Sequence, residues 1–187
     1  MPRAKLRPED WIRAALDAIA ENGISGVAVE TLSIRVGASK GSFYWHFSDR
    51  GALIQAAVEL WERTRTESVI ADIAEVTDAR ERLRRLFTTA FTNPRGGRIE
   101  TALSACADDP RVSPVLQRVT ERRLSYVTGI YEELGFDAES ARRRAAITYS
   151  VYLGFFSLRE ASSRWTPQGE KELDAFMDEL LEILTAS

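Results

Sequence analysis

The sequence predicts an all-α protein of nine helices, with a small three-helix helix-turn-helix head at the N-terminus and a larger helical body behind it. Three observations predict this class. Apolar residues recur at intervals of three and four along nearly the whole chain. The strict alternation typical of β-strands is almost absent, and Gly- or Pro-containing breaks separate the periodic segments. The 187 residues, 44% of them hydrophobic, suffice for a substantial core.

The N-terminal segment contains four expected helices joined by short turns. Pro8 suits the first turn of a helix, and Gly23 suits the left-handed residue that ends one. Gly37 marks the turn between two short helices, and Ser48 is expected to cap the long helix that follows. The expected ranges are 8–22, 30–36, 40–46 and 49–73.

The rest of the chain repeats the pattern with longer helices. The segment 93–97 holds one proline and two glycines and is expected to break the chain. Five helices are expected, over 78–92, 99–107, 112–134, 137–163 and 170–184. We expect residues 1–55 to form the head and residues 56–187 the body, with the boundary inside the fourth helix, so that the two parts are rigidly linked.

The composition argues against an enzyme, a metal protein and a membrane protein. No apolar run reaches the roughly 18 residues that would cross a bilayer, and no secretory signal is seen, so a cytoplasmic location is expected. His46 is the single histidine and Cys106 the single cysteine, too few for a metal site. No phosphate-cradling glycine motif occurs, so no cofactor is expected. Cys106 is read as a small apolar residue rather than a redox sensor.

The charge distribution is uneven. Residues 1–65 carry 9 Lys/Arg and 8 Asp/Glu, whereas residues 66–187 carry 16 and 20, within a net charge of −3. The head is therefore only mildly basic. An argument for nucleic-acid binding must rest on where individual side chains lie, and a protein that coats DNA nonspecifically is disfavoured.

The short third helix has two unlike faces. At 100° a residue, Phe43 and Phe47 should face inward, and Trp45 should lie nearly opposite them. An outward tryptophan either packs on a neighbouring helix or meets DNA. In the second case Lys40 and Ser42 could reach base edges and Trp45 a thymine methyl group.

Other side chains are placed to bind phosphates. Gly41 lets the backbone approach DNA closely, and Tyr44 and His46 lie on the borders of the outward face. Arg50 stands in the first turn of a helix, where a cation is unfavourable for the helix and favours a role towards an anion. An N-terminal arm of Arg3, Lys5 and Arg7 either contacts DNA or is a solvated tail.

The stretch from Val29 to Leu53 resembles the DNA-binding signature of the tetracycline-repressor (TetR) family. The specific part is Gly37-x-Ser39-Lys40-Gly41-Ser42-Phe43-Tyr44-x-His46-Phe47, followed by a basic residue and Leu53. The resemblance covers roughly residues 8–55, and the chain length and nine-helix count also suit the family. It implies DNA-binding roles for Thr31, Ser39, Lys40, Gly41, Ser42, Tyr44, Trp45, His46 and Arg50.

Three positions depart from the family's usual pattern. Val29 stands where a capping threonine is common, so Thr31 is expected to substitute for it. Ser33 replaces an alanine, which should be harmless. Gly51 replaces a glutamate that would complete a capping box, and the start of the fourth helix should be less stable for it.

The body is expected to bind a small ligand and to form a dimer. For any single apolar residue, plain core remains the simpler reading. The resemblance implies instead a pocket between helices with a few polar groups, formed by aromatic and apolar side chains at helical spacing, namely Phe87, Phe91, Tyr126, Ile130, Tyr149 and Tyr152. The resemblance implies that the last two long helices meet their symmetry mates through Val151, Leu158, Leu173, Phe176, Leu180 and Leu184.

The expected function is that of a sequence-specific transcriptional regulator, most simply a repressor. A homodimer would bind a palindromic double-stranded operator with half-sites about 34–36 Å apart. A small apolar or amphipathic effector would favour a second spacing of the heads and release the DNA. Activation, a helical enzyme and a protein-binding adaptor are the alternatives.

Overall fold

The computed structural model describes residues 6–186, and this part of the chain holds helices and no strand. The helices fall into two compact units. The first comprises the chain up to Thr64 together with Arg98–Gln117, and the second comprises Arg65–Gly97 together with the chain from Arg118 onward. The prediction that residues 1–55 form the DNA-binding head and residues 56–187 the body stays a prediction.

The first unit begins with three helices and a turn. They are α1 (Pro8–Asn22), the 3-10 turn η1 (Ile24–Gly26), α2 (Val29–Val36) and α3 (Lys40–Tyr44). Asp10 caps the start of α1 by one half of a capping box, in which the Arg7 backbone N–H donates to Asp10 Oδ2 at 2.9 Å. Gly37, at φ 70°, ends α2 in the left-handed conformation that glycine adopts without strain.

The expected fourth helix is interrupted. It runs as α4 (Arg50–Glu62), a π-helical turn (Arg63–Glu67) and α5 (Ser68–Ala74), and the chain passes from the first unit to the second within that turn. The prediction that Ser48 caps this helix is wrong. Asp49 is the N-cap, and its Oδ1 accepts the Ala52 N–H at 2.9 Å.

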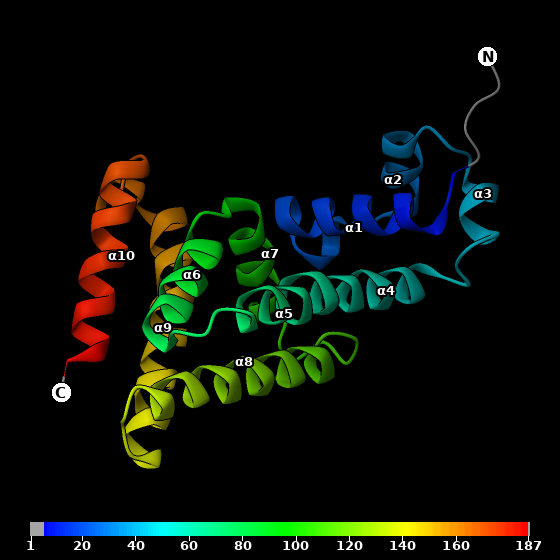
Figure 1. The fold of residues 1–187 in the computed structure, drawn as a ribbon. Coiled ribbons are helices and arrows are strands. Elements are labelled where there is room, and N and C mark those ends of the chain that lie inside the picture. Colours follow the sequence, from blue (N-terminus) through cyan, green and yellow to red (C-terminus); the bar gives the residue numbers. More distant parts are fainter. Residues whose placement is uncertain (1–5, 187) are drawn as a thin grey trace. The chain divides into compact units, whose positions relative to one another are not determined.

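The core of the first unit forms where α1 packs on α2 and α4 (Figure 1). Trp11 and Phe43 are fully buried and meet edge to face, with ring centroids 5.4 Å apart. Phe47 stacks on Phe43 at 5.5 Å. Two of the aromatic side chains of the signature thus anchor α3 to this core.

The second unit is built from α5, α6, most of α8, α9 and α10, together with most of the π-helical turn before α5. Their bounds are α6 (Ala79–Phe91), α7 (Pro94–Ser104), α8 (Ser113–Glu133), α9 (Ala138–Ala161) and α10 (Glu170–Thr185), and α7 is shared between the units. Helices α6 and α10 lie side by side (Figure 1). Phe91 of α6 meets Phe155 of α9 and Phe176 of α10 at centroid distances of 4.9 and 5.6 Å.

The sequence predicts that residues 93–97 separate two helices and that the second begins at residue 99. In the structure α7 already begins at Pro94, inside this segment. Pro94 occupies its first position, and Asn93 Oδ1 accepts the Gly96 N–H at 2.6 Å. A Cβ on Gly97 would lie 2.0 Å from Phe156 Cδ1. The glycine here is required by close helix packing rather than by a turn.

Candidate DNA-binding face and ligand cavity

The outward face of α3 is exposed, as its sequence predicts. Trp45 is 88% exposed and Tyr44 61%, whereas Phe43 is fully buried. Lys40 and Gly41 are exposed as well. A bulky apolar side chain so open to water loses the stabilisation that burial would give it, which favours a partner that covers it.

The start of α3 is held by its own cap. Ser39 Oγ accepts the Ser42 N–H at 3.2 Å, so Ser39 positions the helix in addition to lying on its exposed side. Nothing but Ser39 Oγ, at 3.7 Å, comes within 4 Å of a Cβ built on Gly41. Space around Gly41 is therefore open, and the backbone there is accessible to a partner.

Arg50 has a role inside the protein that the sequence did not reveal. Its Nε donates to the Val27 carbonyl at 2.5 Å, and an Nη donates to the Ile24 carbonyl. The half-buried guanidinium thus fixes the start of α4 to the turn after α1. Its expected phosphate contact stays a prediction.

The remaining predicted DNA-binding side chains are accessible. Thr31 is exposed and His46 and Ser42 are half-buried. The prediction that Val29 occupies the capping position of α2 is wrong, because Ala28 is the N-cap and Val29 the first helical residue. No side chain caps this helix, so Thr31 does not substitute as a cap. Arg3 and Lys5 of the expected arm lie outside the described residues.

The two other departures are accommodated by the fold. The Ser33 hydroxyl is buried and donates to the Val29 carbonyl at 2.7 Å. Beside Gly51, a Cβ would meet Asp49 Oδ1 at 3.0 Å and Arg111 Cδ at 3.8 Å. Arg111 is ion-paired to Asp109, and this lowers the pKa of Asp109 to about 2.

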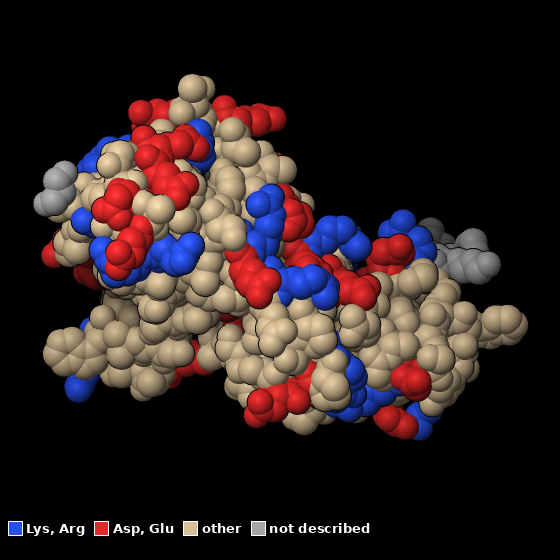
Figure 2. All heavy atoms as spheres, turned by 90° about the horizontal axis from the view of Figure 1, so that it is seen from below, with Lys and Arg blue, Asp and Glu red and all other residues tan. Residues whose placement is uncertain are grey.

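The molecular surface carries no large area of a single sign on the face seen in Figure 2, where acidic and basic side chains are interspersed. Sequence-independent attraction to DNA needs many cationic contacts. This face therefore gives no support to a protein that coats DNA nonspecifically.

A cavity lies within the second unit. Its volume is about 80 Å³, and its walls come from the π-helical turn, α5, α6, α8 and α9. Five of the six side chains predicted to line a pocket do line this cavity, namely Phe87, Phe91, Tyr126, Tyr149 and Tyr152. Ile130 is instead buried in the core cluster.

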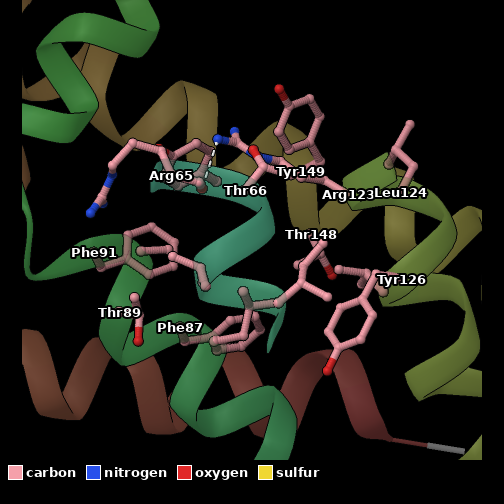
Figure 3. A pocket seen from close by; sticks show the side chains of 16 residues that line it. Arg65, Thr66, Phe87, Thr89, Phe91, Arg123, Leu124, Tyr126, Thr148 and Tyr149 are labelled. Carbon is pink, nitrogen blue, oxygen red and sulfur yellow. Dashed lines mark hydrogen bonds between the residues drawn. The ribbon is translucent and has the colours of Figure 1, made fainter. Parts of the chain in front are cut away.

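The cavity also has a polar side that the sequence did not indicate. Arg123 Nε donates to Thr66 Oγ1 at 3.0 Å, and Arg123 Nη2 donates to the Arg65 carbonyl at 3.2 Å (Figure 3). Thr148, also in the wall, shares a 2.7 Å hydrogen bond with the Tyr131 hydroxyl. The π-helical turn brings Arg65 and Thr66 to the cavity, and no regular helical periodicity could predict that.

Tyr126 differs from the other polar groups in the cavity wall. Its hydroxyl is buried and has no hydrogen-bond partner among the described residues. Burial raises the pKa of Tyr126, so the phenol stays protonated at neutral pH. An unpaired buried hydroxyl is costly to the fold.

The predicted dimer residues are distributed between surface and core. Leu180 and Leu184 are buried in the protomer's own core, and Val151, Leu173 and Phe176 pack against it partly buried. Leu158 is 43% exposed, and Ile147, one turn before Val151, is 51% exposed.

The described residues contain no cluster of three His, Cys, Asp or Glu side chains that could hold a metal ion. None of the helices in this part of the chain is long and apolar enough to span a membrane.

Comparisons with known proteins agree with the signature. Residues 12–57 match the family model for bacterial regulatory proteins of the tetR family. The class A tetracycline repressor from transposon 1721 of Escherichia coli is 42% identical over 55 residues, which are 29% of this chain and 26% of the repressor. The class D tetracycline repressor of Escherichia coli is 38% identical over 61 residues, which are 32% of this chain and 28% of the repressor. The match thus spans only about a quarter of these relatives.

Solved structures extend the similarity of fold to nearly the whole chain. A transcriptional regulator from Saccharomonospora viridis in complex with choline matches with a TM-score of 0.81 at 16% identity, over 94% of this chain and 95% of that one. A transcriptional regulator from Rhodococcus sp. Rha1 matches with a TM-score of 0.78 at 19% identity, over 96% of both chains. The transcriptional regulator FadR from Bacillus subtilis, in complex with stearoyl-CoA, matches with a TM-score of 0.73 at 18% identity. The match covers 96% of this chain and 98% of FadR. These similarities confirm the predicted all-α architecture.

Proposed function

We propose that this chain is a regulator of the TetR family, whose model it matches over residues 12–57. In this proposal it represses transcription from a palindromic operator and leaves the operator when a small molecule binds. The expectation that the chain has no catalytic role stays a prediction, which agrees with the match of residues 12–57 to bacterial regulatory proteins. One observation carries the DNA-binding part. The outward face of α3 presents Lys40, Tyr44 and Trp45 to solvent above the buried Phe43.

The helix face supports a division of roles among these side chains. Lys40 can donate to guanine O6 or N7, and Trp45 can cover a thymine methyl group. Tyr44 and His46 are expected to bind phosphates and set the register of the helix on the duplex. A dimer would place two such helices in successive major grooves, which predicts a palindrome.

Selection from a random-sequence duplex library tests this proposal. We expect the wild-type protein to enrich a palindrome, and Lys40→Ala or Trp45→Ala to lose that enrichment. Lys171→Ala is the matched control, because Lys171 is exposed on α10 in the other unit. Failure of the wild-type protein to enrich any sequence would contradict the proposal and favour a protein-binding adaptor.

For the dimer we propose an interface centred on the exposed apolar side chains of α9. Ile147, Val151 and Leu158 recur at intervals of four and seven residues, so they lie on one face of the helix. Ile147→Glu should give a monomer by sedimentation. Ile34→Glu is the control, because Ile34 is an isoleucine of the first unit that is 83% exposed. Dissociation by both variants, or by neither, would argue against this interface.

For the effector we propose a small apolar or amphipathic molecule in the cavity of the second unit. The aromatic rings of Phe87, Phe91 and Tyr152 would contact its apolar part, and the polar side of the cavity, with Thr66 and Arg123, would contact a polar group on it. The choline and stearoyl-CoA complexes show that other proteins of this fold bind small molecules. A thermal-shift screen followed by release of the selected duplex tests the proposal, and a ligand that binds without weakening DNA binding would contradict it.

A further inference from the structure

The lysine expected to read bases forms an ion pair within the protein. Lys40 Nζ, at the start of α3, donates to Glu30 Oε1 on α2. The two side chains are 58% and 63% exposed, so the pair lies on the surface of the unit. The hydrogen bond from Lys40 lowers the pKa of Glu30, which keeps the carboxylate ionised at neutral pH. Glu30 is outside the set of residues that the signature assigns to DNA binding.

This pair does little for the fold. Exposed ion pairs gain little Coulomb energy in water and lose side-chain freedom. A second exposed pair in the same unit, between Arg35 and Glu21, already joins α2 to α1. A carboxylate beside a DNA-reading lysine, by contrast, has a strong effect on DNA binding, because the duplex carries two phosphate charges per base pair.

We propose that Glu30 is a specificity-determining residue, which makes close contact with DNA unfavourable unless the base sequence satisfies both Glu30 and Lys40. The inference rests on the proposed function, in which α3 enters the major groove. On a random duplex Lys40 stays paired to Glu30, one cationic contact to DNA is lost, and the carboxylate faces phosphates. Both effects weaken sequence-independent binding.

On a matching sequence the two side chains separate and each finds its own partner. The Lys40 ammonium donates to guanine O6 or N7, and the Glu30 carboxylate accepts from the N4 amino group of a cytosine. Guanine thus replaces Glu30 as the acceptor for Lys40, and cytosine replaces Lys40 as the donor to Glu30. The device discriminates by penalising wrong sequences, in addition to rewarding the right one.

The experiment compares Glu30→Gln with Glu21→Gln. Both changes remove one exposed carboxylate from an ion pair of the first unit and keep the length of the side chain. Binding is measured by fluorescence anisotropy at 50 to 200 mM salt. The probes are a random-sequence duplex and a duplex that the wild-type protein has selected from a library.

We expect Glu30→Gln to bind the random duplex about threefold to tenfold more tightly, because one further phosphate contact forms. Its salt dependence on that duplex should steepen by about 0.9 in the slope of log K against log salt. The selected duplex should gain less or lose affinity, so the ratio of specific to random affinity falls. Glu21→Gln should match the wild type in all three measurements.

Three results would overturn the inference, and they are distinguishable. If the wild-type protein selects a sequence and Glu30→Gln keeps its affinity ratio and salt slope, Glu30 plays no part in specificity although the proposed function stands. If the wild-type protein binds no duplex at all, the proposed function fails and the inference fails with it. A Glu21→Gln variant that behaves like Glu30→Gln would show a general charge effect and would also exclude the specific role.

Discussion

Replacement of Trp45 by alanine should separate DNA binding from folding. The side chain is 88% exposed, so its removal takes almost nothing from the core, and the free energy of unfolding should change by less than about 0.5 kcal/mol. If about 100 Å² of the ring, roughly half of a tryptophan side chain, is covered by DNA, its loss costs about 2.5 kcal/mol at 25 cal/mol per Å². That corresponds to roughly a 60-fold rise in Kd.

Phe43→Ala is the matched contrast on the opposite face of the same helix. Phe43 is fully buried and its ring meets those of Trp11, Tyr44 and Phe47 at 5.1–5.5 Å. Its removal should destabilise the first unit by about 3–5 kcal/mol. The assay pairs thermal unfolding followed by circular dichroism with anisotropy on the selected duplex. Wild-type affinity of Trp45→Ala, or a loss of stability as large as that of Phe43→Ala, would refute the reasoning.

Three further outcomes follow from the contacts described. Gly97→Ala should destabilise the second unit by about 1–3 kcal/mol, because its Cβ would lie 2.0 Å from Phe156 Cδ1, and a calorimetric scan with unchanged stability would disprove the close approach. Tyr126→Phe should leave stability unchanged or raise it, because it removes a buried hydroxyl without a hydrogen-bond partner among the described residues, and a clearly lower unfolding temperature would contradict this. The pKa of Asp109 is lowered to about 2 in the folded protein from an ordinary 3.8, so its stabilising contribution is present above about pH 4 and is lost as the pH falls towards 2. Asp109→Asn should therefore flatten the acid side of the stability profile, and an unchanged profile would contradict the role of the Arg111 pair.

Local chemistry made the first unit readable from its sequence. Pro8 and Gly37 mark helix ends through backbone geometry that involves only neighbouring residues. The spacing of Phe43 and Phe47 predicted their burial and the exposure of Trp45, because helical periodicity alone decides which side chains share a face. The cap of α4 was misassigned by one residue, since Ser48 and Asp49 are both good caps.

Roles that depend on distant residues were missed. The sequence predicted that Arg50 binds a phosphate of DNA. Its hydrogen bonds to the Val27 and Ile24 carbonyls could not be predicted, because they depend on the conformation of the turn after α1. The ion pair of Glu30 with Lys40 joins residues ten positions apart across a turn. A sequence pattern indicates the charges and not which of them meet.

The sequence by itself determined the helical class and the faces of α3, because both depend on periodicity within single helices. Periodicity did not distinguish the aromatic wall of the cavity from plain core. Only the tertiary structure decided the polar side of the cavity, where a π-helical turn brings Thr66 to Arg123. It also decided that Gly97 accommodates the Phe156 ring and that Leu180 and Leu184 belong to the protomer's own core. The physical reason is that packing between helices depends on which faces meet, and this information is shared among residues far apart in the chain.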